Sequence, residues 1–206
     1  MGPPLPPESC GTTLTKIAPK KIHIECFVDL ICPFSAKLFN TLYNKVIPSL
    51  DEDVTVTIHQ VVQPWHPQGT MVHEAAFAVR EVSPEHYAPY VSALYAAYTG
   101  GKFKDDDTWN KTRAQIYEEL LDLVPKGVDK DAVKALLMMA KGGGNAGNEM
   151  TKHIKFACKF HRTRGVHVTP TVFVNGVEAG VVSSGWSEED WKKFLAAKGK
   201  DFFRNE

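Results

Sequence analysis

The chain has 206 residues, of which 43% are hydrophobic and 23% are charged, a typical composition for a globular protein. Its 24 basic and 24 acidic residues give a formal net charge of zero, so the chain lacks the basic excess of a nucleic-acid-binding protein. It contains no run of about 18 apolar residues, and we therefore expect no membrane-spanning helix. The first 20 residues lack the apolar stretch of a secretory signal, and no cysteine pair has C-x-x-C spacing, so we expect a cytoplasmic location.

The N-terminal part of the chain predicts a tail followed by two strands. Residues 1–18 contain four prolines among small polar residues, and we expect a flexible tail there. Residues 22–28 and 54–61 are short runs rich in β-branched and apolar side chains, which is typical of buried strands.

A helix is predicted between these two strands. Apolar residues recur there every four positions and end near Pro48, at Phe34, Leu38, Leu42 and Val46. A strand, a helix and a strand within about 40 residues have the length of a right-handed βαβ unit.

The middle of the chain, residues 71–164, is rich in alanine, leucine, glutamate and lysine, and predicts several helices separated by glycine and proline. Thr108, Asp129 and Asn145 are the expected N-caps of three of these helices.

Strand character returns at residues 171–174 and 177–182. The Asn-Gly pair at 175–176 between them predicts a tight β-hairpin. Ser187, with Asp190 three residues later, predicts the start of a final helix.

This order of elements predicts an α/β protein with a mixed sheet that an all-helical insertion interrupts. A parallel pair of strands does not form a sheet alone, so the C-terminal hairpin is expected to complete it across the insertion. The predicted sheet domain is therefore discontinuous, with residues 19–66 and 165–200, and the insertion covers residues 67–164.

The first candidate reactive residue is Cys32, in the sequence Cys32-Pro33-Phe34-Ser35 at the point where the first strand gives way to the helix. Backbone N–H groups and the helix dipole at such a position favour the thiolate, which is the nucleophile in disulfide exchange. Pro33 suits the first helical turn because its missing donor costs nothing there. The alternative is that Cys32 is a small buried hydrophobic residue.

The second candidate segment is Thr169-Pro170, directly before a predicted strand. Proline cannot donate to a strand ladder, so it belongs at the first residue or the edge of a strand. A cis bond would turn the backbone groups of Thr169 outward, towards an extended peptide or a thiol ligand. The alternative is a trans proline that only begins the strand.

Together, Cys-Pro-x-x after the first strand and Gly-Val-x-x-Thr-Pro-Thr-x-Phe-Val-Asn-Gly before the hairpin resemble the DsbA-type branch of the thioredoxin superfamily. The resemblance covers roughly residues 20–198 and implies a thioredoxin-like fold with a helical insertion. It also implies that Cys32 is the nucleophile. Pro33, Phe34, Thr169 and Pro170 would then face the substrate.

Two positions depart from this family. Ser35 stands where the family has its resolving cysteine, and Cys26 stands where it has an acidic residue. We therefore expect a thiol–disulfide oxidoreductase-like protein with a single active-site cysteine, which forms mixed disulfides with a protein or with glutathione. No bound cofactor is expected, and glutathione is a candidate co-substrate. Cys10, on the tail, and Cys158, on an insertion helix, stay open as resolving thiols.

A second resemblance implies the same fold but a different reaction. The segment from Asp29 to Ser35 is similar to the opening of the kappa-class glutathione transferases and their isomerase relatives, which share the fold. It implies a glutathione-dependent transferase or isomerase. A non-catalytic thioredoxin-fold binding protein is the third alternative, and the sequence leaves the oligomeric state open.

The histidines complete the candidates. His59, His66 and His73 are seven residues apart, but the predicted element changes from one to the next, so we expect no metal site. His167 precedes Thr169 by two residues. It is either a neighbour of Cys32 or a loop histidine in solvent, and we favour the latter.

Overall fold

The computed structural model of the chain describes residues 10–15, 22–50 and 54–201. Within these ranges one mixed sheet has the strand order β1-β3-β2-β4-β5. The strands are β1 (Thr12–Thr13), β2 (Ile22–Val28), β3 (Val54–Gln60), β4 (Thr171–Val174) and β5 (Val177–Glu178). β2 and β3 are parallel, whereas every other neighbouring pair is antiparallel.

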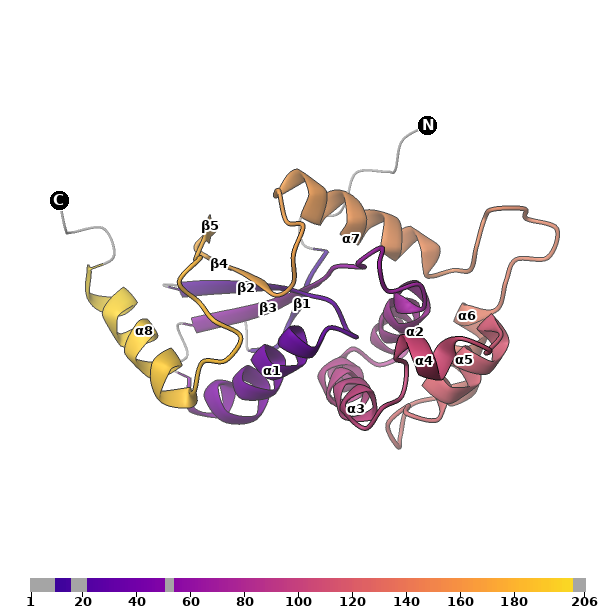
Figure 1. The fold of residues 1–206 in the computed structure, drawn as a ribbon, viewed down its shortest axis with the longest axis horizontal. Coiled ribbons are helices and arrows are strands. Elements are labelled where there is room, and N and C mark those ends of the chain that lie inside the picture. The colour runs from indigo at the N-terminus through magenta and orange to yellow at the C-terminus, as the bar shows by residue number, and fades with distance from the viewer. Residues whose placement is uncertain (1–9, 16–21, 51–53, 202–206) are drawn as a thin grey trace.

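Helices cover both faces of the sheet and form a block at one end of it. They are α1 (Pro33–Thr41), α2 (Gly69–Val82), α3 (Tyr87–Thr99), α4 (Asp105–Thr108), α5 (Arg113–Leu121), α6 (Lys130–Leu137), α7 (Thr151–Thr163) and α8 (Glu188–Asp201). In Figure 1, α1 lies below the sheet, α7 lies above it, α2 to α6 gather at one end, and α8 lies at the other end. Within the described ranges, no helix is long and apolar enough to cross a membrane. The predicted fold class, a mixed sheet interrupted by helices, is therefore confirmed.

Strand β2 is the centre of the sheet and is buried on both faces, which explains its nearly continuous apolar sequence. Ile24, Cys26 and Val28 belong to the main core. Phe27 points to the opposite face, where it packs with a smaller cluster that includes Phe173. The alternation follows from the two-residue period of a strand.

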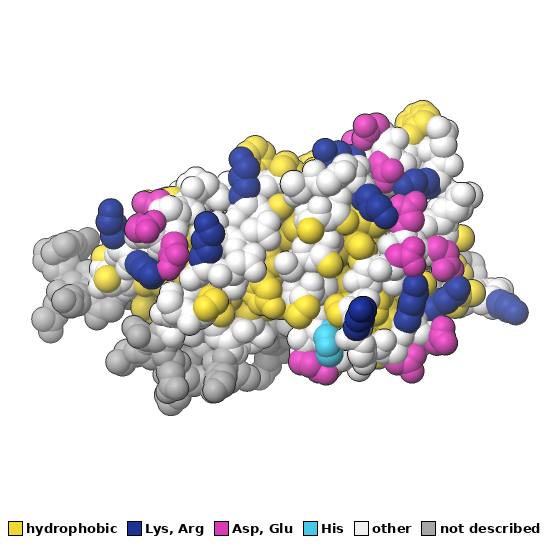
Figure 2. Space-filling model, turned by 90° about the horizontal axis from the view of Figure 1, so that it is seen from below, with side chains coloured by type: hydrophobic (Ala, Val, Ile, Leu, Met, Phe, Trp, Pro, Cys, Tyr) yellow, Lys and Arg dark blue, Asp and Glu magenta, His cyan; other side chains and the backbone are white. Residues whose placement is uncertain are grey.

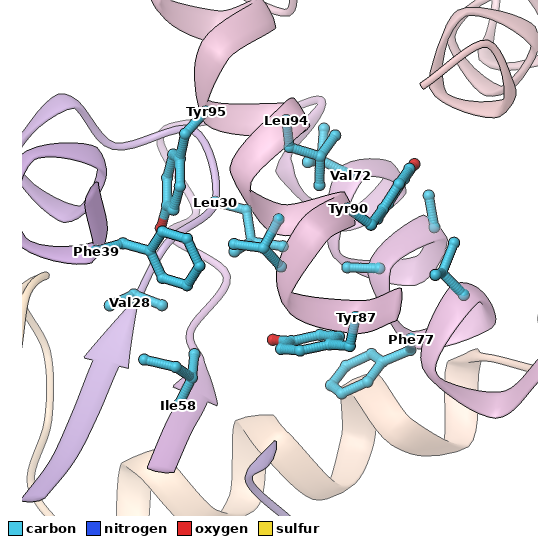
Figure 3. Packing of buried hydrophobic residues seen from close by; sticks show 14 of the residues in the cluster. Val28, Leu30, Phe39, Ile58, Val72, Phe77, Tyr87, Tyr90, Leu94 and Tyr95 are labelled. Carbon is cyan, nitrogen blue, oxygen red and sulfur yellow. The ribbon is translucent and has the colours of Figure 1, made fainter. Parts of the chain in front are cut away.

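The main core continues from the sheet into the helical block without a break. Figure 3 shows Phe39 of α1 and Tyr95 of α3 side by side, with Val28 and Ile58 of the sheet nearby. The ring centroids of Phe39 and Tyr95 are 5.3 Å apart. Sheet and insertion therefore share one hydrophobic core, which fixes the loop after β2 against α3.

The face seen from below has its hydrophobic side chains in the middle and most of its charged side chains towards the two ends (Figure 2). Figure 1 places α1 and α3 over this middle part. Helix α3 has the sequence YAPYVSALYAAYT, so the face that it exposes carries no charged residue.

Part of the predicted tail is ordered against the sheet, which corrects the expectation for residues 10–15. Thr12 and Thr13 pair with Ile58 and Thr57 of β3, and Cys10 is buried. The free backbone groups at the edge of β3 supply partners that the polar tail sequence does not reveal. The rest of the predicted tail, residues 1–9 and 16–18, lies outside the described residues.

The predicted helix after β2 is present, with one correction to its buried face. α1 passes into a π-helical turn, Leu42–Val46, and a 3₁₀ turn, Ile47–Ser49. Leu38 is buried, but Phe34 is 55% exposed. Phe34 belongs to the first turn, beside Cys32, and does not belong to the part of the helix that packs on the sheet.

One of the three predicted N-caps is confirmed. The side chain of Asp129 accepts a hydrogen bond from Ala132 N, 3.0 Å away, and begins α6. Thr108 instead ends α4, and Thr112 caps α5 through a capping box with Gln115. The prediction for Asn145 was wrong as well, because turns continue beyond it to the start of α7.

The predicted hairpin is confirmed, but its second strand is short. Asn175 and Gly176 have φ values of 50° and 83°, as a type I′ turn requires. β5 ends at Glu178 because the chain turns again, with Val182 N bonded to Ala179 O at 2.9 Å.

Candidate active site

Cys32 is the N-cap residue of α1. Its backbone is extended, and Pro33 occupies the first helical position. Cys32 N donates to Asp29 O at 3.2 Å, and Cys32 O accepts from Ala36 N at 2.9 Å. These bonds place the thiol at the N-terminus of α1, which is the positive end of the helix dipole. The residue is 7% exposed, so an incoming group meets only a small part of it.

The Thr169–Pro170 segment lies directly against this thiol. The peptide bond between these residues is cis, and Cys32 Sγ donates to Thr169 O over 3.4 Å. The register of the sheet brings them together, because Thr171 at the start of β4 pairs with Phe27 near the end of β2. The structure thus joins the two segments that the sequence singled out.

Ser35 occupies the interior side of the same helix. It is completely buried, and its Oγ accepts a hydrogen bond from Asp29 N at 3.3 Å. The hydroxyl therefore ties the end of β2 to the first turn of α1, and it is not open to an incoming substrate.

Three segments around Cys32 each expose one large apolar side chain. Phe34 follows Cys32, Val168 precedes Thr169, and Trp65 lies in the loop between β3 and α2. We call Phe34, Trp65 and Val168 the rim residues. They are 53–58% exposed. Pro33 is exposed beside Phe34.

Beneath Cys32 lies the buried carboxylate of Asp29, which begins the segment from Asp29 to Ser35 but had no role assigned to it from the sequence. Asp29 is completely buried, and both of its oxygens are occupied. Oδ1 accepts from Ile31 N at 3.2 Å and lies 3.1 Å from His73 Nε2. Oδ2 accepts from Gln63 N at 3.3 Å and lies 2.8 Å from His66 Nδ1. One side chain therefore joins the Cys32 loop, the β3–α2 loop and helix α2.

These contacts shift the ionisation of the cluster. Burial alone would raise the pKa of Asp29, but its contacts with His66 and His73 outweigh burial and hold that pKa well below its usual range. The hydrogen bond to Asp29 raises the pKa of His66, and this effect exceeds the opposing effect of burial. Asp29 is therefore an anion that the fold stabilises.

The seven-residue spacing of His66 and His73 was the available signal for this cluster. It was not sufficient, because Asp29 lies more than thirty residues away and His59 shares the spacing. His59 Nε2 lies 3.1 Å from Glu25 Oε1 instead, on the opposite side of the sheet. Among the residues that the structure describes, no group of three possible ligands could hold a metal ion.

Gln63 connects this cluster to the other half of the site. Its backbone N–H donates to Asp29, and its side-chain Nε2 donates to His167 O at 3.2 Å. The ring of His167 is exposed, and its Nδ1 lies 3.2 Å from Gly165 O. The backbone of His167 thus supports the Thr169–Pro170 segment, while its ring lies in solvent.

The remaining cysteines are free thiols. Cys26 is buried in β2, and burial raises the pKa of its thiol. Cys10 is buried next to β1, which corrects its expected position on a flexible tail, and burial raises its pKa as well. Cys158 lies half-buried on α7.

No family model and no curated protein matches the sequence. Solved structures do match. A Pseudomonas syringae protein, provisionally described as a protein-disulfide isomerase, has a TM-score of 0.72 and 22% identity, covering 89% of this chain and 96% of its own. Oxidised BdbD from Bacillus subtilis has a TM-score of 0.65 and 16% identity, covering 96% and 97%.

A third match is the thiol-disulfide exchange protein alpha-DsbA2 from Wolbachia pipientis, with a TM-score of 0.61 and 14% identity, covering 92% of this chain and 88% of that one. All three similarities extend over the sheet and the helical block. The chain therefore has the thioredoxin-like fold with a helical insertion that is found in DsbA-type proteins.

Proposed function

We propose that the chain is a thiol–disulfide oxidoreductase that acts through the single thiol of Cys32. The observation that carries the proposal is the 3.4 Å contact between Cys32 Sγ, at the N-terminus of α1, and Thr169 O. The thioredoxin-like fold supports it, because the solved structures with this fold include thiol–disulfide exchange proteins. Fold alone does not assign a reaction, so the argument rests on the site.

The proposed first step is attack by the Cys32 thiolate on a disulfide R–S–S–R′. A bond forms between Cys32 Sγ and one sulfur of the substrate, the S–S bond breaks, and R′S⁻ leaves and takes up a proton. The attack requires the thiolate form of a cysteine, and Cys32 stands at the N-terminus of α1, at the positive end of the helix dipole.

Release of the mixed disulfide needs a thiol from outside the site. The hydroxyl of Ser35 is buried and bonded to Asp29 N, and an alcohol is not an effective nucleophile towards a disulfide near neutral pH. A second thiol R″SH, with glutathione as the candidate, attacks the bound sulfur. It forms R–S–S–R″ and returns Cys32 to the thiolate.

The surroundings of Cys32 favour a peptide or protein as the group R. The rim residues expose apolar side chains on segments that build the site, and peptide segments with apolar side chains bury such surface on binding. Glutathione is the simplest probe of the reaction, because it carries a thiol on a peptide and forms a stable disulfide.

Incubation with oxidised glutathione followed by intact-mass measurement tests the proposal. We expect one glutathione unit on the wild-type chain, none on Cys32→Ser, and one on Cys158→Ser, which removes the half-buried thiol on α7. An adduct that is missing from the wild type, or equal in Cys32→Ser, would overturn it.

A second assay distinguishes the transferase alternative. Conjugation of glutathione to an electrophilic aryl halide by the wild type, retained in part by Cys32→Ser, would assign the chemistry to glutathione instead of Cys32. The proposal requires that neither the wild type nor Cys32→Ser catalyses this conjugation.

A further inference from the structure

His66 connects the buried carboxylate of the site with the solvent. Its side chain is 19% exposed, whereas that of Asp29 is 0% exposed, and the two are joined by a 2.8 Å contact between Nδ1 and Oδ2. Short bonds at both ends hold its backbone: His66 N donates to Gln63 O at 3.1 Å, and His66 O accepts from Gly69 N at 2.8 Å. His66 is therefore held in place beside Asp29, and its ring can exchange a proton with the solvent.

Asp29 in turn joins the two segments that meet at the reactive sulfur. It accepts from Ile31 N, next to Cys32, and from Gln63 N. Gln63 reaches His167 O, two residues before Thr169. A chain of hydrogen bonds thus connects His66 with both segments that meet at the Cys32–Thr169 contact.

The charged groups around His66 favour its protonated form. Asp29 faces it from the β2–α1 loop, and Asp105 faces it from the start of α4. Further titratable groups face Asp29 from the helices, namely His73 of α2 and Tyr95 and Tyr98 of α3, and His161 of α7 lies near His73. Among these groups, His66 both contacts the Asp29 carboxylate directly and has a ring that is partly exposed to solvent.

We propose that His66 is a positioning residue for Cys32: its protonated ring holds Asp29, and so the two loops at the sulfur, in the arrangement in which the thiol reacts. Loss of the proton from His66 loosens this arrangement. The reactivity of Cys32 therefore follows the protonation of His66 in addition to the thiol–thiolate equilibrium on which the reactivity of every cysteine depends. This inference rests on the proposed role of Cys32 as the nucleophile.

The test is the rate at which iodoacetamide alkylates Cys32, measured by peptide mass spectrometry from about pH 5 to about pH 9, the range that spans histidine and cysteine titration. Iodoacetamide is uncharged, so the charge of His66 does not steer it. The variant is His66→Asn, because the asparagine amide occupies the place of Nδ1 and keeps a donor to Asp29 without the titration. We expect two inflections for the wild type and the loss of one in His66→Asn.

The matched control is His86→Asn. His86 is another partly exposed histidine whose Nδ1 lies near a carboxylate, 3.4 Å from Glu85, but it lies in the helical block, away from Cys32. We expect this variant to keep both inflections. Two inflections in His66→Asn, with only a uniform change in rate or a lower melting temperature, would reduce His66 to a structural role and overturn the proposal. Loss of an inflection in His86→Asn would overturn it as well.

The same samples distinguish this inference from the proposed function. If iodoacetamide modifies Cys32 with the expected profiles but oxidised glutathione leaves it unmodified, the oxidoreductase proposal fails and the positioning role stands. If glutathione adds to Cys32 and the wild type shows a single inflection, the positioning role fails alone.

Discussion

At the scale of single residues, Asp29 determines how the candidate site is built. Its two oxygens, which are buried, contact two backbone N–H groups and two histidine rings. A buried charge costs free energy unless such partners compensate it, and removing one member of a compensated set leaves the others unpaired. Asp29 therefore supports both the stability of the chain and the geometry around Cys32.

The first prediction concerns Asp29→Asn, which keeps the shape of the side chain but removes its charge. The amide of asparagine has only one oxygen, so its NH₂ group would face one of the two backbone N–H groups, of Ile31 or Gln63, that now donate to the carboxylate. We expect the free energy of unfolding to fall by about 3 kcal/mol or more, measured by urea denaturation. Asp122→Asn is the control, because the Asp122–Lys130 pair is exposed and is expected to contribute little. Equal effects of the two substitutions would contradict this account of Asp29.

The second prediction concerns the pH dependence of stability that His66 contributes. The folded chain binds the proton of His66 more tightly than the unfolded chain, since Asp29 raises its pKa. This contribution is fully present below the unfolded pKa of about 6.5 and is lost as the pH rises through the folded pKa.

The measurement is the difference in the free energy of unfolding between the wild type and His66→Asn at a series of pH values. The difference should decrease as the pH rises. Burial lowers the pKa of His153 and of His161, so these two act in the opposite direction, but they contribute equally to both proteins and cancel. A difference that is constant or that grows with pH would contradict the prediction.

At the scale of elements, helix starts in the insertion depend on side chains that satisfy free backbone N–H groups. Thr112 and Gln115 form a reciprocal capping box at the start of α5, where the sequence analysis had instead placed a cap at Thr108. Both residues are threonines followed by helix-forming sequence, so composition did not separate them. The two threonines differ in their place in the fold. Thr108 is the last residue of α4, whereas Thr112 directly precedes α5.

The third prediction compares these two threonines. Thr112→Ala removes a cap and is expected to lower the free energy of unfolding by about 1 kcal/mol. Thr108→Ala removes only a hydroxyl bonded to Lys104 O at the end of α4 and is expected to have a smaller effect. Urea denaturation of both variants checks the order, and a larger loss for Thr108→Ala would contradict it.

At the scale of the whole molecule, the C-terminal helix closes the core on the α1 face of the sheet. Trp191 of α8 is 1% exposed and packs edge-to-face against Trp186, with ring centroids 5.3 Å apart. Helix α8 also contacts the π-helical turn Leu42–Val46. The last predicted helix is therefore part of the domain that holds Cys32, although the whole insertion separates the two in sequence.

The fourth prediction tests this closure. Trp191→Ala should lower the free energy of unfolding by about 3–5 kcal/mol, because it leaves a cavity in a packed core. Trp109→Ala is the matched control, since Trp109 is 82% exposed and its removal leaves no cavity. Thermal and urea unfolding give the comparison, and similar losses for both variants would show that α8 does not close the core.

The sequence by itself determined those features that depend on neighbours along the chain. The apolar runs of β2 and β3, the Asn175–Gly176 turn and the Asp129 cap were all predicted, because strand period, left-handed backbone and helix capping each depend on a few adjacent residues. The position of Cys32 at the start of a helix was predictable for the same reason.

The tertiary structure decided which distant residues meet. The pairing of β1 with β3, and the convergence of Asp29, His66 and His73, depend on how separate segments pack, and no local pattern encodes these contacts. The contact of Cys32 with Thr169 required the antiparallel register of β2 and β4 across 137 residues of chain. Such contacts form only when the whole core buries its apolar surface, because that burial offsets the entropy lost in bringing distant segments together.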